Sequence, residues 1–180
     1  TIFQLRRSIN ASLNAINSDP TTAGWFTNYV LYPFDSGLNR ADWYPVVDST
    51  NPNDIVNAIG NIQINAFPGS APCSTQCPRP IYGVLADLLN RTSFAMPNSV
   101  ILVITRSSPE DYLTLNQLSS TLQSAKVYLN FAYTNIDSPC GMGWNGNDAL
   151  SLFRAVSYNS GNVFTVCACV CVCVCVSNLC

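Results

Sequence analysis

The sequence predicts an α/β fold built on a doubly wound, mainly parallel sheet. Amphipathic helical stripes alternate with short apolar segments along the whole chain, which is the pattern of βαβ units. Two segments, residues 99–106 and 127–133, are continuous apolar runs of the kind buried on both faces of a parallel sheet. Most connections between these segments are short, so consecutive elements should lie side by side in space.

The first third of the chain predicts two helices and two strands. Apolar residues recur at every third or fourth position at its start: Ile2, Leu5, Ile9, Leu13 and Ile16. This stripe indicates a helix that ends at Asp19-Pro20. The aromatic and β-branched segment 25–34 predicts a strand, and segment 43–47, which contains a proline, predicts a strand at a sheet edge. Asn53-Asp54 is typical of the cap of a short helix that extends to about residue 62.

The rest of the chain continues the alternation after a long loop. Residues 65–80 contain four prolines and two cysteines, and loops of this length are usually functional or tied by disulfides. The predicted elements that follow are a helix from residue 81, a strand over 99–106, a helix opened by Ser108-Pro109, a strand over 127–133, a helix over 147–158 and a strand over 163–166.

The last residues differ from the rest of the chain. Residues 1–166 predict one partial domain, whereas residues 167–180 are a low-complexity tail in which cysteine and valine alternate. A repeated TG dinucleotide in DNA translates as Cys-Val, so we interpret the tail as the read-through of an intron or repeat. A genuine strand or a metal-binding tract is the alternative, and a spliced transcript that encodes the tail would support that alternative.

Composition and charge exclude several classes of function. The chain has 8 Lys and Arg, 10 Asp and Glu, a net charge of −2 and no basic cluster, so nucleic-acid binding is not expected. Histidine is absent, which removes the commonest general base, the commonest metal ligand and every Ser-His or Cys-His pair. No glycine-rich phosphate loop follows a predicted strand. No apolar run approaches the ~20 residues that span a bilayer. We therefore expect a protein that is not an enzyme and has no cofactor and no membrane span.

Candidate binding residues follow the predicted strands. In parallel α/β sheets, ligands bind beyond the carboxyl ends of the strands. The residues expected there are Asp35-Ser36, the loop with Cys73 and Cys77, Thr105-Arg106-Ser107 and the loop with Cys140. The carboxylates near helix starts or on helix faces are interpreted as caps or solvated surface groups: Asp87, Glu110, Asp111, Asp137 and Asp148.

Cysteines and glycosylation sequons favour an oxidising compartment. A Cys77–Cys140 disulfide would join two loops at one edge of the sheet, which in the chain-entropy model stabilises by roughly 3–4 kcal/mol. A local Cys73–Cys77 bridge with Cys140 unpaired is the alternative, and the pairing of Cys73 is open. Asn10-Ala-Ser and Asn90-Arg-Thr are glycosylation sequons, which fit a secreted protein.

Four stretches resemble a known family. They are YVLYPFDS at 29–36, QCPRPIYGVLADLL at 76–89, PNSVILVITRSSPEDY at 97–112 and ALSLFRAVSYNSGNVFTV at 149–166. In this order they are similar to von Willebrand factor A-type domains, most closely those of hemicentin-like proteins. The resemblance covers residues 1–166. It implies a Rossmann-like fold with an antiparallel edge strand, in which the first strand of the family, with its Asp-x-Ser-x-Ser metal motif, would precede Thr1.

The resemblance also implies a degraded metal site. The places of two further family ligands are taken by Gln76, which offers a neutral amide oxygen, and by Arg106, whose guanidinium has no lone pair for a cation. We therefore expect an extracellular interaction or adhesion module without a working metal site. Its partner-binding face would comprise Asp35, Ser36, Gln76, Arg106 and Ser107, and its protein partner is unknown. The alternatives are a secreted hydrolase or small-ligand-binding domain that uses carboxylates such as Asp35 and Asp137, and a gene fragment without independent function.

Overall fold

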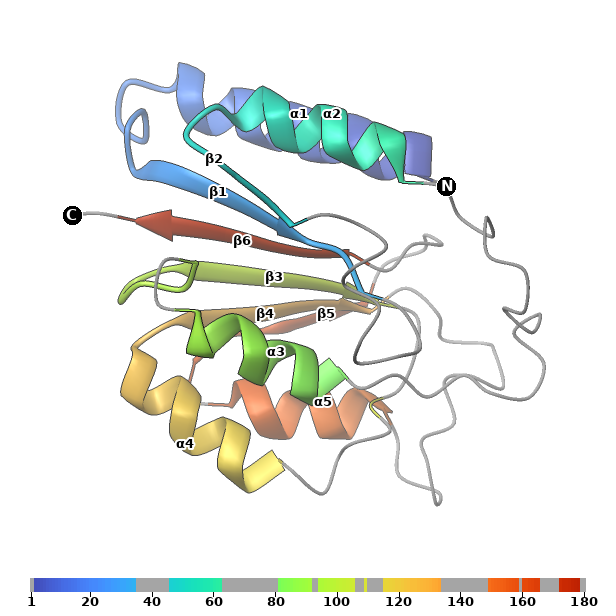
Figure 1. The fold of residues 1–180 in the computed structure, drawn as a ribbon, viewed down its shortest axis with the longest axis vertical. Coiled ribbons are helices and arrows are strands. Elements are labelled where there is room, and N and C mark those ends of the chain that lie inside the picture. The colour runs from blue at the N-terminus through green and yellow to red at the C-terminus, as the bar shows by residue number, and fades with distance from the viewer. Residues whose placement is uncertain are drawn as a thin grey trace.

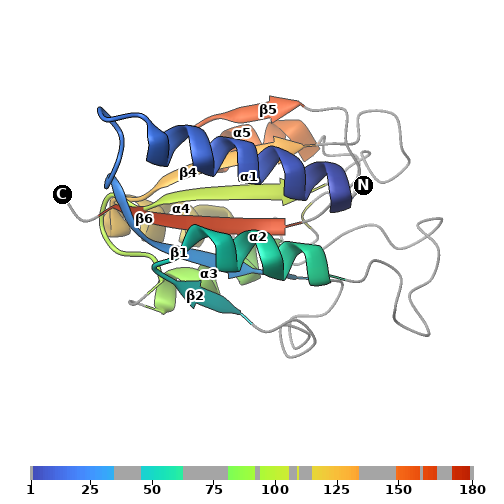
Figure 2. The same cartoon turned by 90° about the horizontal axis from the view of Figure 1, so that it is seen from above.

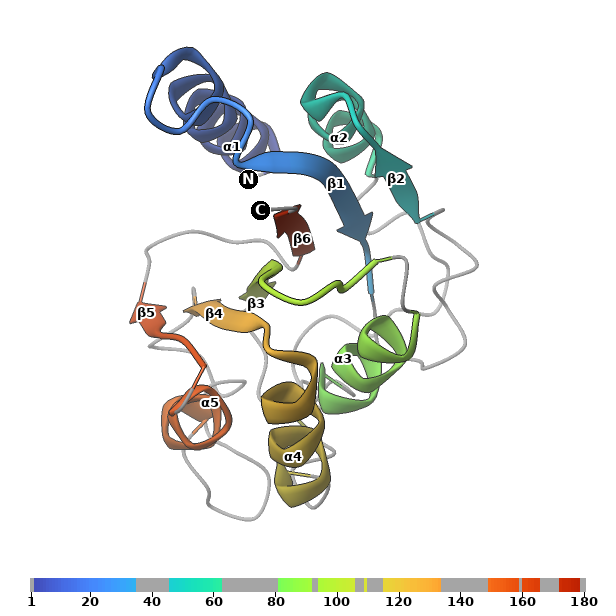
Figure 3. The same ribbon diagram turned by 90° about the vertical axis from the view of Figure 1, so that its left-hand side faces the viewer.

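A six-stranded sheet lies between two layers of helices (Figure 1). The computed structural model describes residues 2–34, 46–62, 81–91, 94–105, 109, 115–133, 149–158, 160–165 and 172–178. On one face of the sheet lie α1 (Ile2–Ser18) and α2 (Pro52–Asn61). On the other face lie α3 (Ile81–Asn90), α4 (Leu115–Ala125) and α5 (Ala149–Ser157), as the view along the strands also shows (Figure 3). The predicted α/β class, with helices and strands alternating, is confirmed.

The strands are, in chain order, β1 (Phe26–Tyr32), β2 (Val47–Ser49), β3 (Val100–Thr105), β4 (Tyr128–Tyr133), β5 (Val163–Thr165) and β6 (Val172–Asn178). Their order across the sheet is β2-β1-β6-β3-β4-β5. The neighbours β3, β4 and β5 are parallel, which confirms that the two continuous apolar runs pair as parallel strands. At the opposite edge, β2 pairs antiparallel with β1, so an antiparallel edge strand is present where the proline-containing segment ends.

The position between β1 and β3, which we call the central slot, is filled from the C-terminal end of the chain. β6 lies there and pairs antiparallel with both neighbours. The expectation of a mainly parallel sheet is therefore wrong for the pairs around the slot, and residues 172–178 are part of the sheet rather than outside the domain. Backbone N–H and C=O groups on both sides of the slot need partners, and alternating valine suits a strand. The origin of the tail in the DNA remains a prediction.

Two apolar cores hold the helical layers on the sheet. On the side of α3, α4 and α5, Phe131 of β4 stacks on Phe153 of α5 with ring centroids 4.4 Å apart, and the edge of Tyr133 meets Phe153 at 5.7 Å. On the side of α1 and α2, Ile55 and Ile59 are fully buried. The alternation of β1 divides its side chains between these cores, because successive residues of a strand point to opposite faces.

The predicted helix and strand boundaries shift by a few residues. β1 and β3 lie within the predicted ranges 25–34 and 99–106, and α1 ends at Ser18, directly before the predicted stop. The edge strand begins where segment 43–47 ends. The described part of the fourth helix begins at Leu115, so the start predicted at Ser108-Pro109 lies outside what the structure describes as helix.

The turn after α1 is held by a carboxylate. Asp19 Oδ1 accepts hydrogen bonds from the backbone N–H and the hydroxyl of Thr21, both at 2.8 Å. These two donors stabilise the charged form and lower the pKa of Asp19 below its usual 3.8. A lowered pKa in the folded state means that the contribution of this turn to stability is present above the usual pKa. It is lost as the pH falls through the lowered value.

The cap of α2 lies two residues before the predicted position. Asn51 is extended, with φ −101° and ψ 112°, and its side chain accepts a 3.1 Å hydrogen bond from the N–H of Asn53. Pro52 takes the first helical position, where a missing N–H costs nothing. The prediction of a cap at Asn53-Asp54 is therefore wrong, because Asn53 supplies the N–H that the cap receives.

Replacing the cap should destabilise the protein measurably. We expect Asn51→Ala to lower the free energy of unfolding by about 1 kcal/mol, because the N–H of Asn53 loses its acceptor. Urea denaturation followed by circular dichroism measures this change. Asn53→Ala is the matched control, since it keeps the donated N–H, and it should leave the urea midpoint almost unchanged. A larger loss with Asn53→Ala than with Asn51→Ala would contradict this assignment of the cap.

Candidate binding site at the carboxyl ends of the strands

Four strands end at the same edge of the sheet, which we call the carboxyl rim. β1 and β3 are both antiparallel to β6, so they run in the same direction as each other and as β4 and β5. Their last residues are Tyr32, Thr105, Tyr133 and Thr165, and all four strands point to the same end of the sheet in Figures 1 and 2. β6 begins at this rim with Val172, which pairs with Ile104.

The last residues of three strands form one row. Thr105 pairs with Tyr133, and Tyr133 pairs with Thr165. Thr105 is fully buried and Tyr133 is 4% exposed, and the ring of Tyr133 meets Phe153 of α5 edge-on. The backbones of three strands thus end level with one another at the rim, which places the starts of the loops that follow them in one row.

Four of the residues predicted to form the binding face come shortly after these strand ends in the sequence. Asp35 and Ser36 come after β1, and Arg106 and Ser107 come after β3. All seven residues of the predicted face and disulfide lie outside the described residues: Asp35, Ser36, Gln76, Cys77, Arg106, Ser107 and Cys140. Their roles, including the Cys77–Cys140 pairing and the degraded metal site, stay predictions.

A cluster of polar and aromatic side chains joins β1 to α3. The hydroxyl of Tyr32 donates a hydrogen bond to Oδ2 of Asp87. The same oxygen accepts a 3.1 Å hydrogen bond from Nε of Arg91 and forms an ion pair with Nη2 of Arg91, also at 3.1 Å, across one turn of helix. The guanidinium of Arg91 lies 5.6 Å from the ring centroid of Tyr32 and 5.8 Å from that of Phe94. One half-exposed carboxylate therefore connects a strand, a helix and the turn that leads to β3.

Asp87 has more contacts than the sequence indicates. It is an exposed group on the face of α3, which agrees with the interpretation as a solvated surface carboxylate, and it is not a cap. Its carboxylate also accepts hydrogen bonds from Tyr32 and Arg91. Asp87 and Arg91 stand four residues apart, which on a helix places them side by side and could have been predicted. The contact with Tyr32 spans 55 residues of sequence and could not. Through these contacts the carboxylate joins β1 to α3.

The hydroxyl of Tyr32 should contribute to stability. We expect Tyr32→Phe to lower the free energy of unfolding by about 1 kcal/mol, because hydrogen bonds to charged groups are stronger than neutral ones and Asp87 is half exposed. The measurement is thermal or urea denaturation. Tyr158→Phe is the matched control, since Tyr158 is 84% exposed, and it should be neutral. Equal midpoints for both variants would contradict a stabilising role of the Tyr32 hydroxyl.

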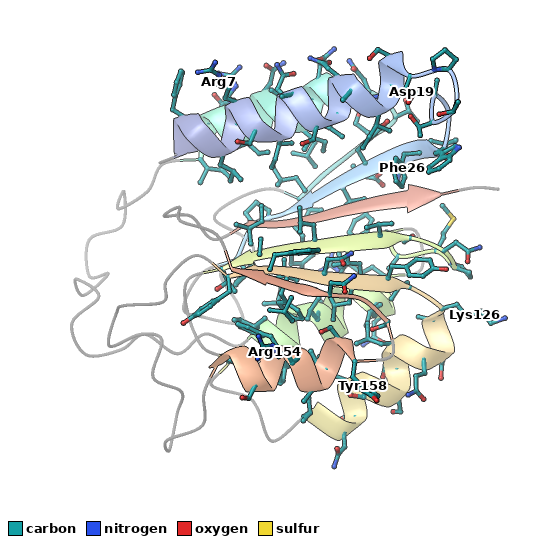
Figure 4. All side chains as sticks on the ribbon, turned by 180° about the vertical axis from the view of Figure 1, so that it is seen from behind. Arg7, Asp19, Phe26, Lys126, Arg154 and Tyr158 are labelled. Atoms are coloured by element: carbon teal, nitrogen blue, oxygen red, sulfur yellow. The ribbon has the colours of Figure 1, made fainter. Side chains whose placement is uncertain are left out.

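Other surfaces offer little chemistry. Ser151, Arg154, Ala155 and Tyr158 of α5 and its end line a broad, open hollow; Figure 4 labels Arg154 and Tyr158 there. Within the described ranges, no three His, Cys, Asp or Glu side chains gather in a way that could hold a metal ion. The same residues contain no helix with the length and apolar character needed to cross a membrane.

Comparison with known proteins gives one distant relationship. No family model and no solved structure matches the sequence. Protein irg-7 of Caenorhabditis elegans is 28% identical over 132 residues, which cover 73% of this chain and 6% of that protein. The chain thus corresponds to a small part of a much longer curated relative.

Proposed function

We propose that the chain is a von Willebrand factor A-type domain of the hemicentin-like kind, acting as an extracellular protein-interaction module. The observation that carries this proposal is the strand order around the central slot. When the slot is counted as the first strand, the order β2-β1-slot-β3-β4-β5 becomes 3-2-1-4-5-6, the order of a doubly wound sheet. The four resembling stretches, of which 29–36 and 97–112 contribute β1 and β3, support the same family.

The proposed mechanism is binding at the carboxyl rim without catalysis. In doubly wound sheets the binding crevice lies where the strand order reverses, which here is at the slot between β1 and β3. Arg106 follows β3 directly and Asp35 follows β1 closely. A guanidinium in the place of a metal ligand favours an acidic group on the partner and makes binding independent of divalent cations. The match to a short part of protein irg-7 supports a module within a longer chain.

Binding to extracellular matrix tests the proposal. The labelled chain is added to decellularised matrix with and without EDTA, and saturable binding is measured. We expect EDTA to have no effect and Arg106→Glu to weaken binding about tenfold, the loss of roughly 1.4 kcal/mol. Lys126→Glu is the charge-matched control, because Lys126 is exposed at the turn before β4, at the opposite end of the sheet. Loss of binding in EDTA, or equal effects of the two variants, would contradict this mechanism.

A further inference from the structure

The two glycosylation sequons lie in different parts of the helical layers. Asn10 lies in the middle of α1, which continues to Ser18, whereas Asn90 is the last residue of α3. Asn10 is partly buried, and its amide oxygen accepts a 3.3 Å hydrogen bond from Nδ2 of Asn14. Asn90 is exposed. The same motif is therefore enclosed in a continuous helix in one case and placed at the end of a helix in the other.

Helix geometry separates the two functional groups of the first sequon. The motif works through the amide of the asparagine and the hydroxyl two positions later. On an α-helix, residues i and i+2 do not face each other, so α1 holds the Asn10 amide and the Ser12 hydroxyl on different sides. Asn90, by contrast, is the last residue of α3, and it is exposed.

Arg91, the middle residue of the second sequon, is held by contacts with neighbouring side chains. The guanidinium of Arg91 is bound to Asp87 at 3.1 Å and lies 5.8 Å from the ring centroid of Phe94. The N–H of Phe94 donates a 2.8 Å hydrogen bond to the carbonyl of Arg91, and a turn leads from there to β3. These contacts of Arg91 with Asp87 and Phe94 do not use the side chain of Asn90.

We propose that Asn90 carries an N-linked glycan and that Asn10 does not. In the transfer, a bond forms between Nδ2 of Asn90 and the anomeric carbon of a lipid-linked oligosaccharide diphosphate. The bond from that carbon to the diphosphate oxygen breaks, the diphosphate leaves with its electron pair, and the amide loses one proton. The inference rests on the extracellular location in the proposed function. Since α3 ends where the chain turns to enter β3, the glycan projects from the end of the sheet opposite the carboxyl rim and leaves that rim open (Figure 1).

The test is expression of the chain behind a cleavable heterologous signal peptide in cultured animal cells. Gel mobility before and after peptide-N-glycosidase F counts the glycans, and mass spectrometry of the released peptides locates them. The wild type and Asn10→Gln should each carry one glycan, and Asn90→Gln should carry none. Thr92→Ala should also lose the glycan although Asn90 is retained, whereas Thr92→Ser should keep it, so the result does not depend on one variant folding correctly.

Three outcomes would overturn the inference. They are a glycan on Asn10, two glycans on the wild type, and the absence of a glycan on Asn90 in protein recovered from inside the cells. Because the signal peptide is supplied, the result is independent of the partner. A glycan at Asn90 without matrix binding contradicts the proposed function alone, and matrix binding by a chain that is never glycosylated contradicts this inference alone.

Discussion

Deletion of residues 167–180 is expected to abolish the cooperative unfolding of the rest of the chain. The deletion removes β6, which makes six register pairs with β1 and five with β3. The backbone groups of two central strands then lose their partners, and each unpaired buried group costs about 1–3 kcal/mol. A few such losses equal the roughly 5–15 kcal/mol by which a domain is stable. Differential scanning calorimetry should show no sharp transition, and size-exclusion chromatography should show aggregates that form through the two open edges.

A matched variant tests whether the fold needs the strand itself or the thiols of its cysteines. Replacement of Cys173 and Cys175 by threonine places β-branched residues, which favour strands, at the two positions that pair with Tyr32 and Val30 of β1, and it removes these two thiols. We expect this variant to unfold cooperatively, at a temperature close to that of the unchanged chain. If the deleted chain unfolds as sharply as the unchanged one, β6 is not part of the fold, and the interpretation of the tail as read-through gains support.

The positions of the main strands in the sequence could be predicted, because each strand is marked by its own run of apolar residues. Residues 99–106 and 127–133 are continuously apolar, and they form the parallel pair β3 and β4. The partner of the Cys-Val segment could not be predicted, because the period of two indicates a strand but says nothing of where that strand pairs. The central slot depends on the arrangement of the whole sheet. It is present because β1 and β3 are not adjacent and one strand fits between them.

The cap of α2 was predicted with the correct residue type, but two residues too late in the sequence. Asn51 and Asn53 are the same residue type, and the decisive signal is Pro52, which favours the first helical position and so makes Asn51 the cap. For the candidate site, the sequence indicates which residues follow the strands. The row of Thr105, Tyr133 and Thr165 shows that three of those strands end level with one another. Whether the loops beyond it bring Arg106 and Cys140 together depends on loop contacts that neither periodicity nor sheet register determines.

The other large effect is expected from Gly161→Ala. A Cβ atom at Gly161 would lie 1.7 Å from the carbonyl oxygen of Leu129 in β4, far inside van der Waals contact, and this oxygen belongs to the backbone. The N–H groups of Leu129 and Phe131 donate to the carbonyls of Ser160 and Asn162 at 2.8 and 2.9 Å, so the strain falls on the bonds that hold β5 to β4. We expect a loss of about 3 kcal/mol or more in the free energy of unfolding. This corresponds to a fall in Tm of roughly 6–12 °C for a domain of this size.

Gly60→Ala is the matched control, because it adds the same methyl group at a glycine where the neighbouring atoms can move. At Gly60 the three atoms nearest to the added Cβ belong to the guanidinium group of Arg6, with Nη1 at 2.9 Å. This group is exposed and can swing away at the cost of a 3.2 Å surface hydrogen bond to Asn57. Alanine also favours the helix by about 1 kcal/mol over glycine, so the Tm of this variant should be unchanged or slightly raised. Hydrogen exchange locates the effect, because only Gly161→Ala should expose the amide protons of Leu129 and Phe131. Unchanged protection of these two protons in Gly161→Ala would mean that β5 does not approach β4 as closely as the structure places it, and the parallel edge on which the strand-order argument depends would be lost with it.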